Sequence, residues 1–110
     1  MMNPFEIFIA YLTWGSGGKY RPILALIVGG NSVDMFRITT QFENKSVFIQ
    51  AHYFEINDWA QAGLDKQSYV DTGTLITLPL NTFKDRTPIG KLTKNDRCRL
   101  LEFLTNTEEP

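Results

Sequence analysis

The chain has 110 residues, with 11 Lys and Arg against 12 Asp and Glu, and a formal net charge of −1. This length supports one compact domain, residues 1–110, and a hydrophobic content of 43% supplies enough apolar surface for a core, which excludes wholesale disorder. The near-zero net charge excludes a globally basic nucleic-acid binder but allows a local basic patch.

Targeting and redox features of the sequence indicate the cytoplasm. No apolar run approaches the roughly 20 residues that a membrane-spanning helix needs, and the start MMNPFEIF lacks the basic and apolar regions of a signal peptide. The single cysteine, Cys98, cannot form an internal disulfide, which fits a reducing compartment and leaves no cysteine-rich zinc site. We therefore expect a cytoplasmic protein without a metal, a cofactor or a membrane contact.

The first third of the chain is expected to form strands. Residues 5–11 show the period-two pattern of a mostly buried strand, and residues 13–21, with three glycines, predict a loop. Pro22 opens a run over residues 23–28 that is apolar on both faces, as in a central strand. The sequence Gly-Gly-Asn at residues 29–31 then predicts a tight turn.

An antiparallel strand is expected to follow the turn, over residues 33–40. The alternation of side chains along a strand places Phe36 and Ile38 on one face. Arg37 and Thr39 then lie together on the other face. This strand therefore presents two polar side chains side by side.

The middle of the chain is less regular. Residues 41–46 predict a polar loop and residues 47–56 another strand. Asp58 is expected to cap a short helix that Gly63 ends. Residues 68–80 predict a further extended segment.

The last third changes character. Residues 81–88 predict a polar loop, Thr93 followed by Asp96 predicts a helix start, and residues 105–110 are expected to be a frayed acidic tail. Three leucines form one stripe of the helix: Leu100, Leu101 and Leu104. About five short strands and a terminal helix favour a mainly β domain with small α additions, built on a strongly bent sheet or barrel.

Two short motifs look like catalytic signatures but lack their surroundings. The glycine-rich segment 15–19 departs from a phosphate-binding loop, because Tyr20 stands where Ser or Thr is needed and no helix follows. Asp71-Thr72-Gly73 matches the aspartic-protease triplet, yet only 37 residues follow it, too few for the rest of that fold. We interpret the first as a flexible loop and the second as a bulge in a strand.

Three segments, in order, carry a resemblance to a known family. A glycine-rich loop leads into Lys19-Tyr20-Arg21-Pro22 and an apolar strand, Arg37-Ile38-Thr39-Thr40-Gln41 ends the next strand, and Ile89-Gly90-Lys91-Leu92-Thr93 opens the last helix. Across about residues 5–104, the chain resembles the MazF/PemK toxins of type II toxin–antitoxin systems. The order and spacing of the segments make this resemblance specific, since each segment alone is common.

The resemblance implies an SH3-like barrel of the MazF/PemK/CcdB type with a C-terminal helix, usually a homodimer. It also implies a metal-independent endoribonuclease of the mRNA interferase type, which cuts single-stranded RNA and is silenced when a cognate antitoxin protein occupies the RNA groove. The family's catalytic Arg maps onto Arg21. Its catalytic Thr maps best onto Thr39, with Thr40 as the neighbouring possibility.

The chemistry of RNA cleavage suits these residue types. Attack of the ribose 2′-OH on the phosphodiester builds negative charge on the phosphate oxygens, which the fixed charge and forked donors of Arg21 can bind. A Thr39 hydroxyl at a strand end can donate to one of those oxygens. Arginine is a poor general base, because its pKa lies above about 12. No carboxylate precedes Arg21 in its loop, so the sequence leaves the proton acceptor unassigned.

Further basic and polar residues are expected to contact RNA. Arg37 shares the face of Thr39 and is predicted to bind phosphate. The other candidates lie in loops or beside the catalytic positions: Lys19, Tyr20, Thr40, Gln41, Lys84 and Arg86. The alternative for each is an ordinary surface charge or polar group. For Arg21 it is an ion pair with a nearby carboxylate, and for Thr39 a residue that favours strands.

Two other functions stay open on the same barrel. The missing carboxylate before Arg21 favours a catalytically inactive MazF-like binding module. A toxin that poisons DNA gyrase would depend on the C-terminal residues, where Glu108-Glu109-Pro110 offer no apolar anchor. RNA cleavage in the presence of a chelator distinguishes the enzyme from both.

Overall fold

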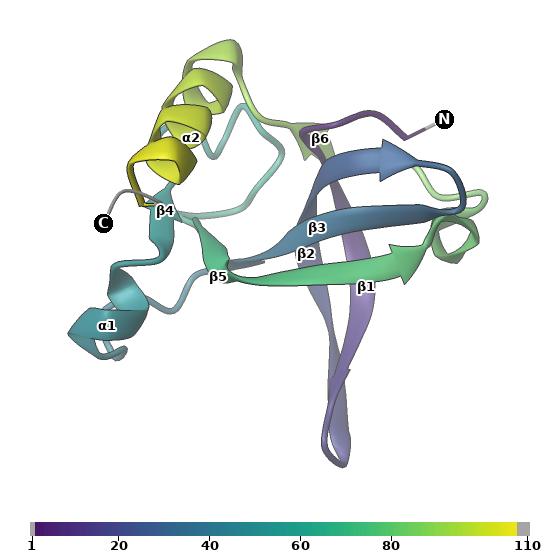
Figure 1. Cartoon of the computed structure of the whole chain (residues 1–110), viewed down its shortest axis with the longest axis horizontal. Helices are drawn as coiled ribbons and strands as arrows, with labels where there is room; N and C mark the ends of the chain where they lie inside the picture. Colours follow the sequence, from purple (N-terminus) through teal and green to yellow (C-terminus); the bar gives the residue numbers. More distant parts are fainter. Residues whose placement is uncertain (1, 108–110) are drawn as a thin grey trace.

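Six antiparallel strands form one curled sheet, a half-barrel, in the computed structural model, which describes residues 2–107 (Figure 1). The strands are β1 (Glu6–Trp14), β2 (Gly17–Gly29), β3 (Ser32–Thr39), β4 (Tyr53–Glu55), β5 (Tyr69–Pro79) and β6 (Gly90–Lys91), in the sheet order β4-β5-β3-β2-β1-β6. The helices are α1 (Val47–Gln50), the 3₁₀ turn η1 (Leu80–Phe83) and α2 (Lys94–Thr107). The expectation of a mainly β fold with a C-terminal helix is confirmed.

The β1–β2 hairpin is much longer than expected and forms a two-stranded arm that projects from the sheet (Figure 1). Residues 13–21, predicted to be a loop, continue both strands instead, and only Gly15 and Ser16 form the turn. Gly15 has a φ of 48°, a left-handed conformation that suits so short a turn. The glycines of this segment therefore shape a strand pair rather than a flexible loop.

The second hairpin agrees with the prediction from its turn sequence. β2 ends at Gly29, β3 begins at Ser32, and Gly30 has a φ of 56°. β2 is a central strand, as expected, but Pro22 lies inside it rather than at its start. Pro22 pairs with β1 alone, because the pairing with β3 begins one residue later, at Ile23.

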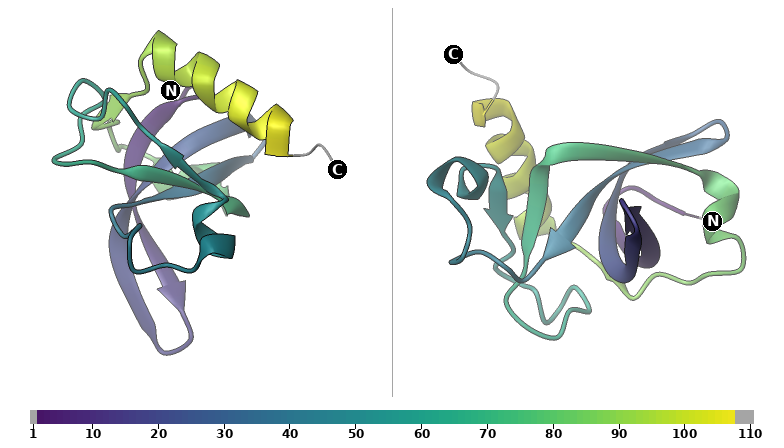
Figure 2. Two further views of the ribbon diagram at one scale, coloured as in Figure 1. Left: turned by 90° about the vertical axis from the view of Figure 1, so that its left-hand side faces the viewer. Right: turned by 90° about the horizontal axis from the view of Figure 1, so that it is seen from below.

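The sheet packs a hydrophobic cluster against each of its faces, and Figure 2 shows α2 lying across one of them. Phe36 and Ile38 belong to the cluster that α2 covers, together with Leu100 of that helix. Met35 and Ile23 belong to the cluster on the other face. The predicted division of the β3 side chains between two faces is confirmed.

The middle of the chain corrects two predictions. Residues 47–56 do not form one strand: Ser46 caps α1, its Oγ accepting a hydrogen bond from the Ile49 N–H at 3.3 Å, and only Tyr53–Glu55 pair with the sheet. The local cap outweighs the β propensity of this apolar segment. Residues 58–63 form consecutive turns rather than the predicted helix. Gly63 has a φ of 93°, a left-handed conformation that stops the turns from continuing as a helix.

The helix start at Thr93 is confirmed, since its Oγ1 accepts a hydrogen bond from the Asp96 N–H at 3.3 Å. The stripe differs from the prediction: Leu100 is fully buried, whereas Leu101 is 51% exposed. The expected frayed tail is helical as far as Thr107, and residues 108–110 lie outside the described part of the chain. Within residues 2–107, no helix has both the length and the apolar character needed to span a membrane.

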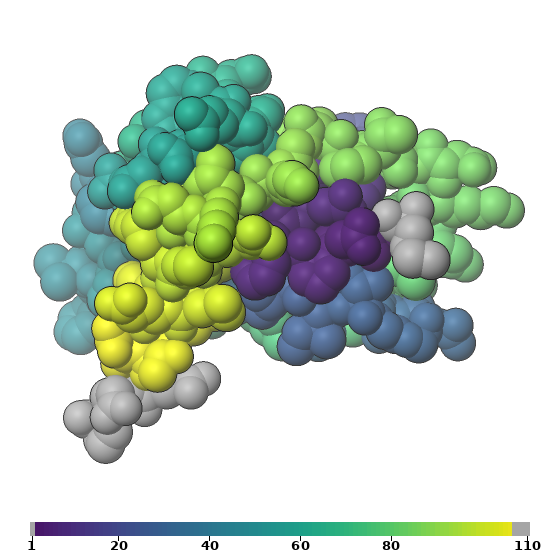
Figure 3. All heavy atoms as spheres, turned by 90° about the horizontal axis from the view of Figure 1, so that it is seen from above, coloured from purple at the N-terminus to yellow at the C-terminus, as the bar shows by residue number. Residues whose placement is uncertain are grey.

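The N-terminal strand is tied to the segment that leads into α2. The Ile89 N–H donates to the Ile7 carbonyl at 2.8 Å, and the Leu92 N–H donates to the Phe5 carbonyl at 3.0 Å. In Figure 3 the first residues (purple) lie at the surface between α2 (yellow) and the green segment that precedes it. Gly90 of β6 packs directly against the backbone of Ala62, so the turns at residues 58–63 are held in the same junction.

Asp96 secures this junction from inside the protein. Its side chain is fully buried and accepts hydrogen bonds from the Asn57 N–H at 3.2 Å, the Asp58 N–H at 2.8 Å and Arg99 Nη1 at 2.6 Å. A buried carboxylate is tolerated because donors surround it.

Substituting Asp96 with alanine is therefore expected to destabilise the protein by about 3 kcal/mol, since two backbone donors and one guanidinium lose their acceptor. Urea unfolding followed by circular dichroism measures this. Asp65→Ala, at an exposed position, is the control and should leave the midpoint unchanged. Equal midpoints for the two variants would contradict the assigned role of Asp96.

Candidate functional site

Three neighbouring strands bring charged side chains to one face of the sheet. The register pairs Ile23 of β2 with Arg37 of β3, and Arg37 with Asp71 of β5. Arg21 precedes Ile23 by two residues, so it shares this face with Arg37 and Asp71. Thr39, two residues after Arg37, lies on the same face.

A pocket of about 250 Å³ opens where the hairpin arm meets this face of the sheet. Its lining combines the charged residues with side chains of the arm and of β5: Leu12, Thr13, Trp14, Arg21, Arg37, Asp71, Thr74 and Ile76. The two arginines that the sequence singled out are thus brought together, at the base of the arm.

Arg37 and Asp71 form an ion pair inside the pocket. Arg37 Nη2 donates to Asp71 Oδ2 at 2.7 Å, and the two side chains are 34% and 14% exposed. The Asp71 Oδ1 atom accepts a second hydrogen bond, from the Gly73 N–H at 3.0 Å. Asp71 therefore fixes the direction in which the Arg37 guanidinium points.

A bulge in β5 places Asp71 in this position. β3 pairs with β5 up to Leu75 and again from Asp71, so residues 72–74 are left out of the ladder. Thr72 turns away to the residue before β4, since its N–H and its hydroxyl both donate to the His52 carbonyl, at 2.9 and 2.7 Å. The predicted bulge at Asp71-Thr72-Gly73 is confirmed. No local pattern indicated that this bulge delivers a carboxylate to the arginines.

Arg21 has a buried donor without an acceptor. Within residues 2–107, its Nε is the only buried side-chain nitrogen or oxygen that lacks a hydrogen-bond partner. Its guanidinium carbon lies 5.8 Å from the centre of the Trp14 ring, in a cation–π contact. An unsatisfied buried N–H on a cation costs stability until it gains an acceptor.

Tyr53 of β4 pairs with Asp71 of β5 across the sheet. Burial, and then the negative charge of Asp71, raise the pKa of its hydroxyl, while Arg37 and Arg21 oppose the shift. The phenol therefore stays neutral at physiological pH.

Thr39 is buried, with 5% of its surface exposed, and does not line the pocket. Its Oγ1 accepts a hydrogen bond from the Gln41 N–H at 3.1 Å, which leaves its own hydroxyl proton free for another acceptor. Thr40 and Gln41 are exposed and line a different depression, of about 510 Å³, beside the stacked rings of Phe42 and Tyr69.

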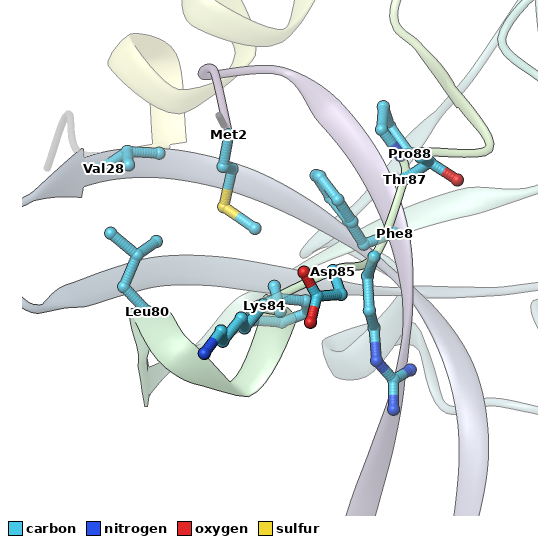
Figure 4. Close-up of a pocket in the computed structure, with 10 residues that line it drawn as sticks. Met2, Phe8, Val28, Leu80, Lys84, Asp85, Thr87 and Pro88 are labelled. Carbon is cyan, nitrogen blue, oxygen red and sulfur yellow. The ribbon is translucent and has the colours of Figure 1, made fainter.

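The remaining predicted RNA contacts are divided between two places. Lys19 is two residues from Arg21 and shares its face of the arm. Tyr20 points to the opposite face, where its ring packs edge to face against the Tyr11 ring, with 5.0 Å between the ring centres. Lys84 and Arg86 line a separate, mostly apolar pocket of about 540 Å³, which Figure 4 shows.

Arg86 is engaged in that second pocket, since its Nη1 donates to the Ile9 carbonyl at 3.1 Å. No group of three or more His, Cys, Asp and Glu side chains within the described residues is placed to hold a metal ion. The site is therefore centred on Arg21, Arg37 and Asp71.

Comparison with known proteins finds similarity among solved structures. No family model matches the sequence, and no curated protein matches it. Among solved structures, the chain is similar to the Mycobacterium tuberculosis toxin MazF-mt6, with a TM-score of 0.69 and 25% sequence identity. The match covers 92% of this chain and 93% of that chain. The chain therefore has the fold of a MazF-like toxin.

Proposed function

We propose that the chain is the toxin of a type II toxin–antitoxin system and a metal-independent endoribonuclease that cuts single-stranded RNA. The observation that carries the proposal is the buried Nε–H of Arg21, which lacks an acceptor in a pocket that Arg37 also lines. Two guanidinium groups and one carboxylate leave the pocket with a net positive charge. A phosphodiester, with its single negative charge, complements that pocket.

The pocket residues suggest a role for each group in cleavage. The ribose 2′-oxygen attacks phosphorus, and the bond from phosphorus to the 5′-oxygen breaks, which gives a 2′,3′-cyclic phosphate and a 5′-hydroxyl. Arg21 binds the charged phosphate oxygens during this step, and Arg37 adds a second positive charge beside it. The charge stabilisation that a metal ion supplies in other nucleases then comes from the guanidinium groups.

Asp71 is the proposed acceptor for the 2′-OH proton. It is the one acidic residue among those that line the pocket, and it supplies from β5 the carboxylate that is missing from the segment before Arg21. The leaving 5′-oxygen takes its proton from water. Thr39, the expected donor to a phosphate oxygen, shares the face of Arg37, but it is buried and does not line the pocket, so the phosphate contacts are assigned to the two arginines.

The presence of Asp71 weakens the case for an inactive binding module, which rested on the missing carboxylate. The MazF-like fold supports the remaining parts of the proposal, apart from the Lys19 contact, which rests on its place on the face of Arg21. They are a homodimer in the cytoplasm, a cognate antitoxin that covers the RNA groove, and Lys19 as an additional phosphate contact.

The proposal is tested with single-stranded RNA and single-stranded DNA of one sequence, each incubated with the purified protein. We expect the RNA to be cut into fragments that end in a 2′,3′-cyclic phosphate, and the DNA, which lacks the 2′-OH, to stay intact. Cleavage of both, or RNA fragments with a 3′-hydroxyl, would contradict attack by the 2′-oxygen. Supercoiled DNA incubated with gyrase and the protein tests the gyrase alternative, and should show no trapped breaks.

Asp71→Asn removes the proposed proton acceptor and keeps the shape of the side chain. We expect the single-turnover rate of RNA cleavage to fall by about 10²-fold or more, the usual contribution of a positioned acid or base. Asp65→Asn, at an exposed position outside the pocket, should cleave at the native rate. A native rate for Asp71→Asn would exclude Asp71 as the acceptor.

A further inference from the structure

Trp14 is a large aromatic residue that stays exposed beside the charged pocket. It lines the pocket that contains Arg21, and the Arg21 guanidinium lies over its ring, yet 53% of its surface is accessible. Burial of a tryptophan contributes more to the free energy of unfolding than burial of most side chains, so the exposed Trp14 ring contributes less than it could. A ligand that covers the ring restores that contribution.

Glycine at position 17 lets the Trp14 ring lie against the opposite strand of the arm with its other side exposed. Trp14 pairs with Gly17 across the hairpin, and a Cβ at Gly17 would lie 3.2 Å from Trp14 Nε1. Any larger residue would press on the ring. Tyr11 lies in the same way over Gly18, whose Cβ would be 2.6 Å from the Tyr11 hydroxyl oxygen.

The two rings lie on opposite faces of the arm, because Gly17 and Gly18 are successive residues of one strand. The face of Trp14 also carries Lys19 and Arg21, whereas the face of Tyr11 carries Tyr20. Positive charge and an open ring thus occur together on one face only.

We propose that Trp14 is a stacking platform for an unpaired base of the RNA, adjacent to the phosphate that Arg21 binds. This inference rests on the proposed function. One ribose separates a base from its phosphate, and the Trp14 ring centre lies only 5.8 Å from the Arg21 guanidinium carbon, so both groups can engage one nucleotide. Every base has a face that can stack, so Trp14 supplies affinity and position, while other residues select the sequence.

Fluorescence gives a direct measurement of this contact. The chain has two tryptophans, and Trp59 packs against a core cluster, so Trp59→Phe leaves Trp14 as the reporter. A short 2′-O-methyl oligouridylate is the probe, because it cannot be cut by 2′-OH attack. We expect it to quench the emission of Trp14. Emission that does not respond to the probe, or that changes only with protein concentration as in a contact between copies of the chain, would overturn the proposal.

Binding variants then separate stacking from other effects. Trp14→Ala should weaken binding of the probe about tenfold, within the usual range for one stacked base. Tyr11→Ala is the matched control, since Tyr11 is 52% exposed on the same arm but on the opposite face. It should bind the probe as the native protein does. Equal losses for the two variants would show a general effect on the arm and reject the platform.

A thermodynamic cycle excludes a purely structural role, in which Trp14 only positions Arg21. Probes with one abasic residue at each position in turn are bound to the native protein and to Trp14→Ala. Stacking predicts one position at which loss of the base weakens native binding about tenfold and leaves Trp14→Ala binding unchanged. A positioning role predicts that Trp14→Ala weakens binding by the same factor for every probe, whichever position is abasic. That result would contradict the proposal.

The outcome is separable from that of the proposed function, which RNA cleavage by the native protein tests on its own. Suppose that the loss of one base weakens native binding but not Trp14→Ala binding, which we call coupling, while natural RNA is not cut. This result would support Trp14 as a platform and reject the nuclease. Cleavage without coupling at any position would support the nuclease and reject the platform.

Discussion

Arg21→Lys is expected to reduce the single-turnover rate of RNA cleavage by about 10²-fold or more, the loss typical for one donor to a developing oxyanion. Lysine keeps the positive charge but has neither the planar fork nor the Nε–H, which is buried without an acceptor in the native protein. The substitution therefore tests the geometry of the site rather than its charge.

Arg97→Lys is the control for Arg21→Lys. Arg97 is exposed on α2 and makes a similar cation–π contact, with its guanidinium carbon 5.9 Å from the centre of the Phe5 ring, but it does not line the pocket. Its cleavage rate should be native. Should Arg21→Lys also cleave at the native rate while remaining folded, a charge in the pocket would suffice and the role assigned to the guanidinium would be wrong.

Gly90→Ala is expected to cause a large loss of stability. A Cβ at this position would overlap the carbonyl oxygen of Ala62, a backbone atom that cannot move without breaking the turns at residues 58–63. We expect a loss of about 4 kcal/mol, which lowers Tm by about 15 °C or more in a domain of this size.

Gly29→Ala is the matched control, because no atom lies within 4 Å of the Cβ that it would introduce. A strand residue other than glycine restricts the unfolded chain, so Tm should stay the same or rise slightly. Thermal unfolding of both variants, followed by circular dichroism, checks the pair. A Tm for Gly90→Ala within a few degrees of that for Gly29→Ala would show that β6 and Ala62 are not packed as described.

The parts of the fold predicted from the sequence depend on local patterns. Alternation in β3 separated Phe36 and Ile38 from Arg37, and the structure confirms that division. The turn before β3 and the start of α2 at Thr93 were likewise encoded by neighbouring residues. Such patterns predict the structure correctly because the turns and hydrogen bonds that they specify form between residues close together in the sequence.

The segments that differ from the prediction are those whose structure depends on tertiary contacts. The glycines of residues 13–21 are typical of a loop, and nothing local shows that Gly17 and Gly18 make room for aromatic rings across a hairpin. The Arg37–Asp71 pair joins residues that are 34 positions apart. Its formation depends on the register of β3 with β5 and on the bulge, neither of which the sequence of one strand determines. The charged site is therefore a product of sheet topology.

The proposed endoribonuclease cuts RNA at the Arg21 pocket without a metal ion. The most direct test incubates native protein and Arg21→Ala with a long unstructured RNA in excess EDTA, after circular dichroism has shown that both are folded. We predict discrete fragments from the native protein and intact RNA from Arg21→Ala. Intact RNA with both proteins would contradict the nuclease, and equal fragments with both would contradict the assignment of Arg21.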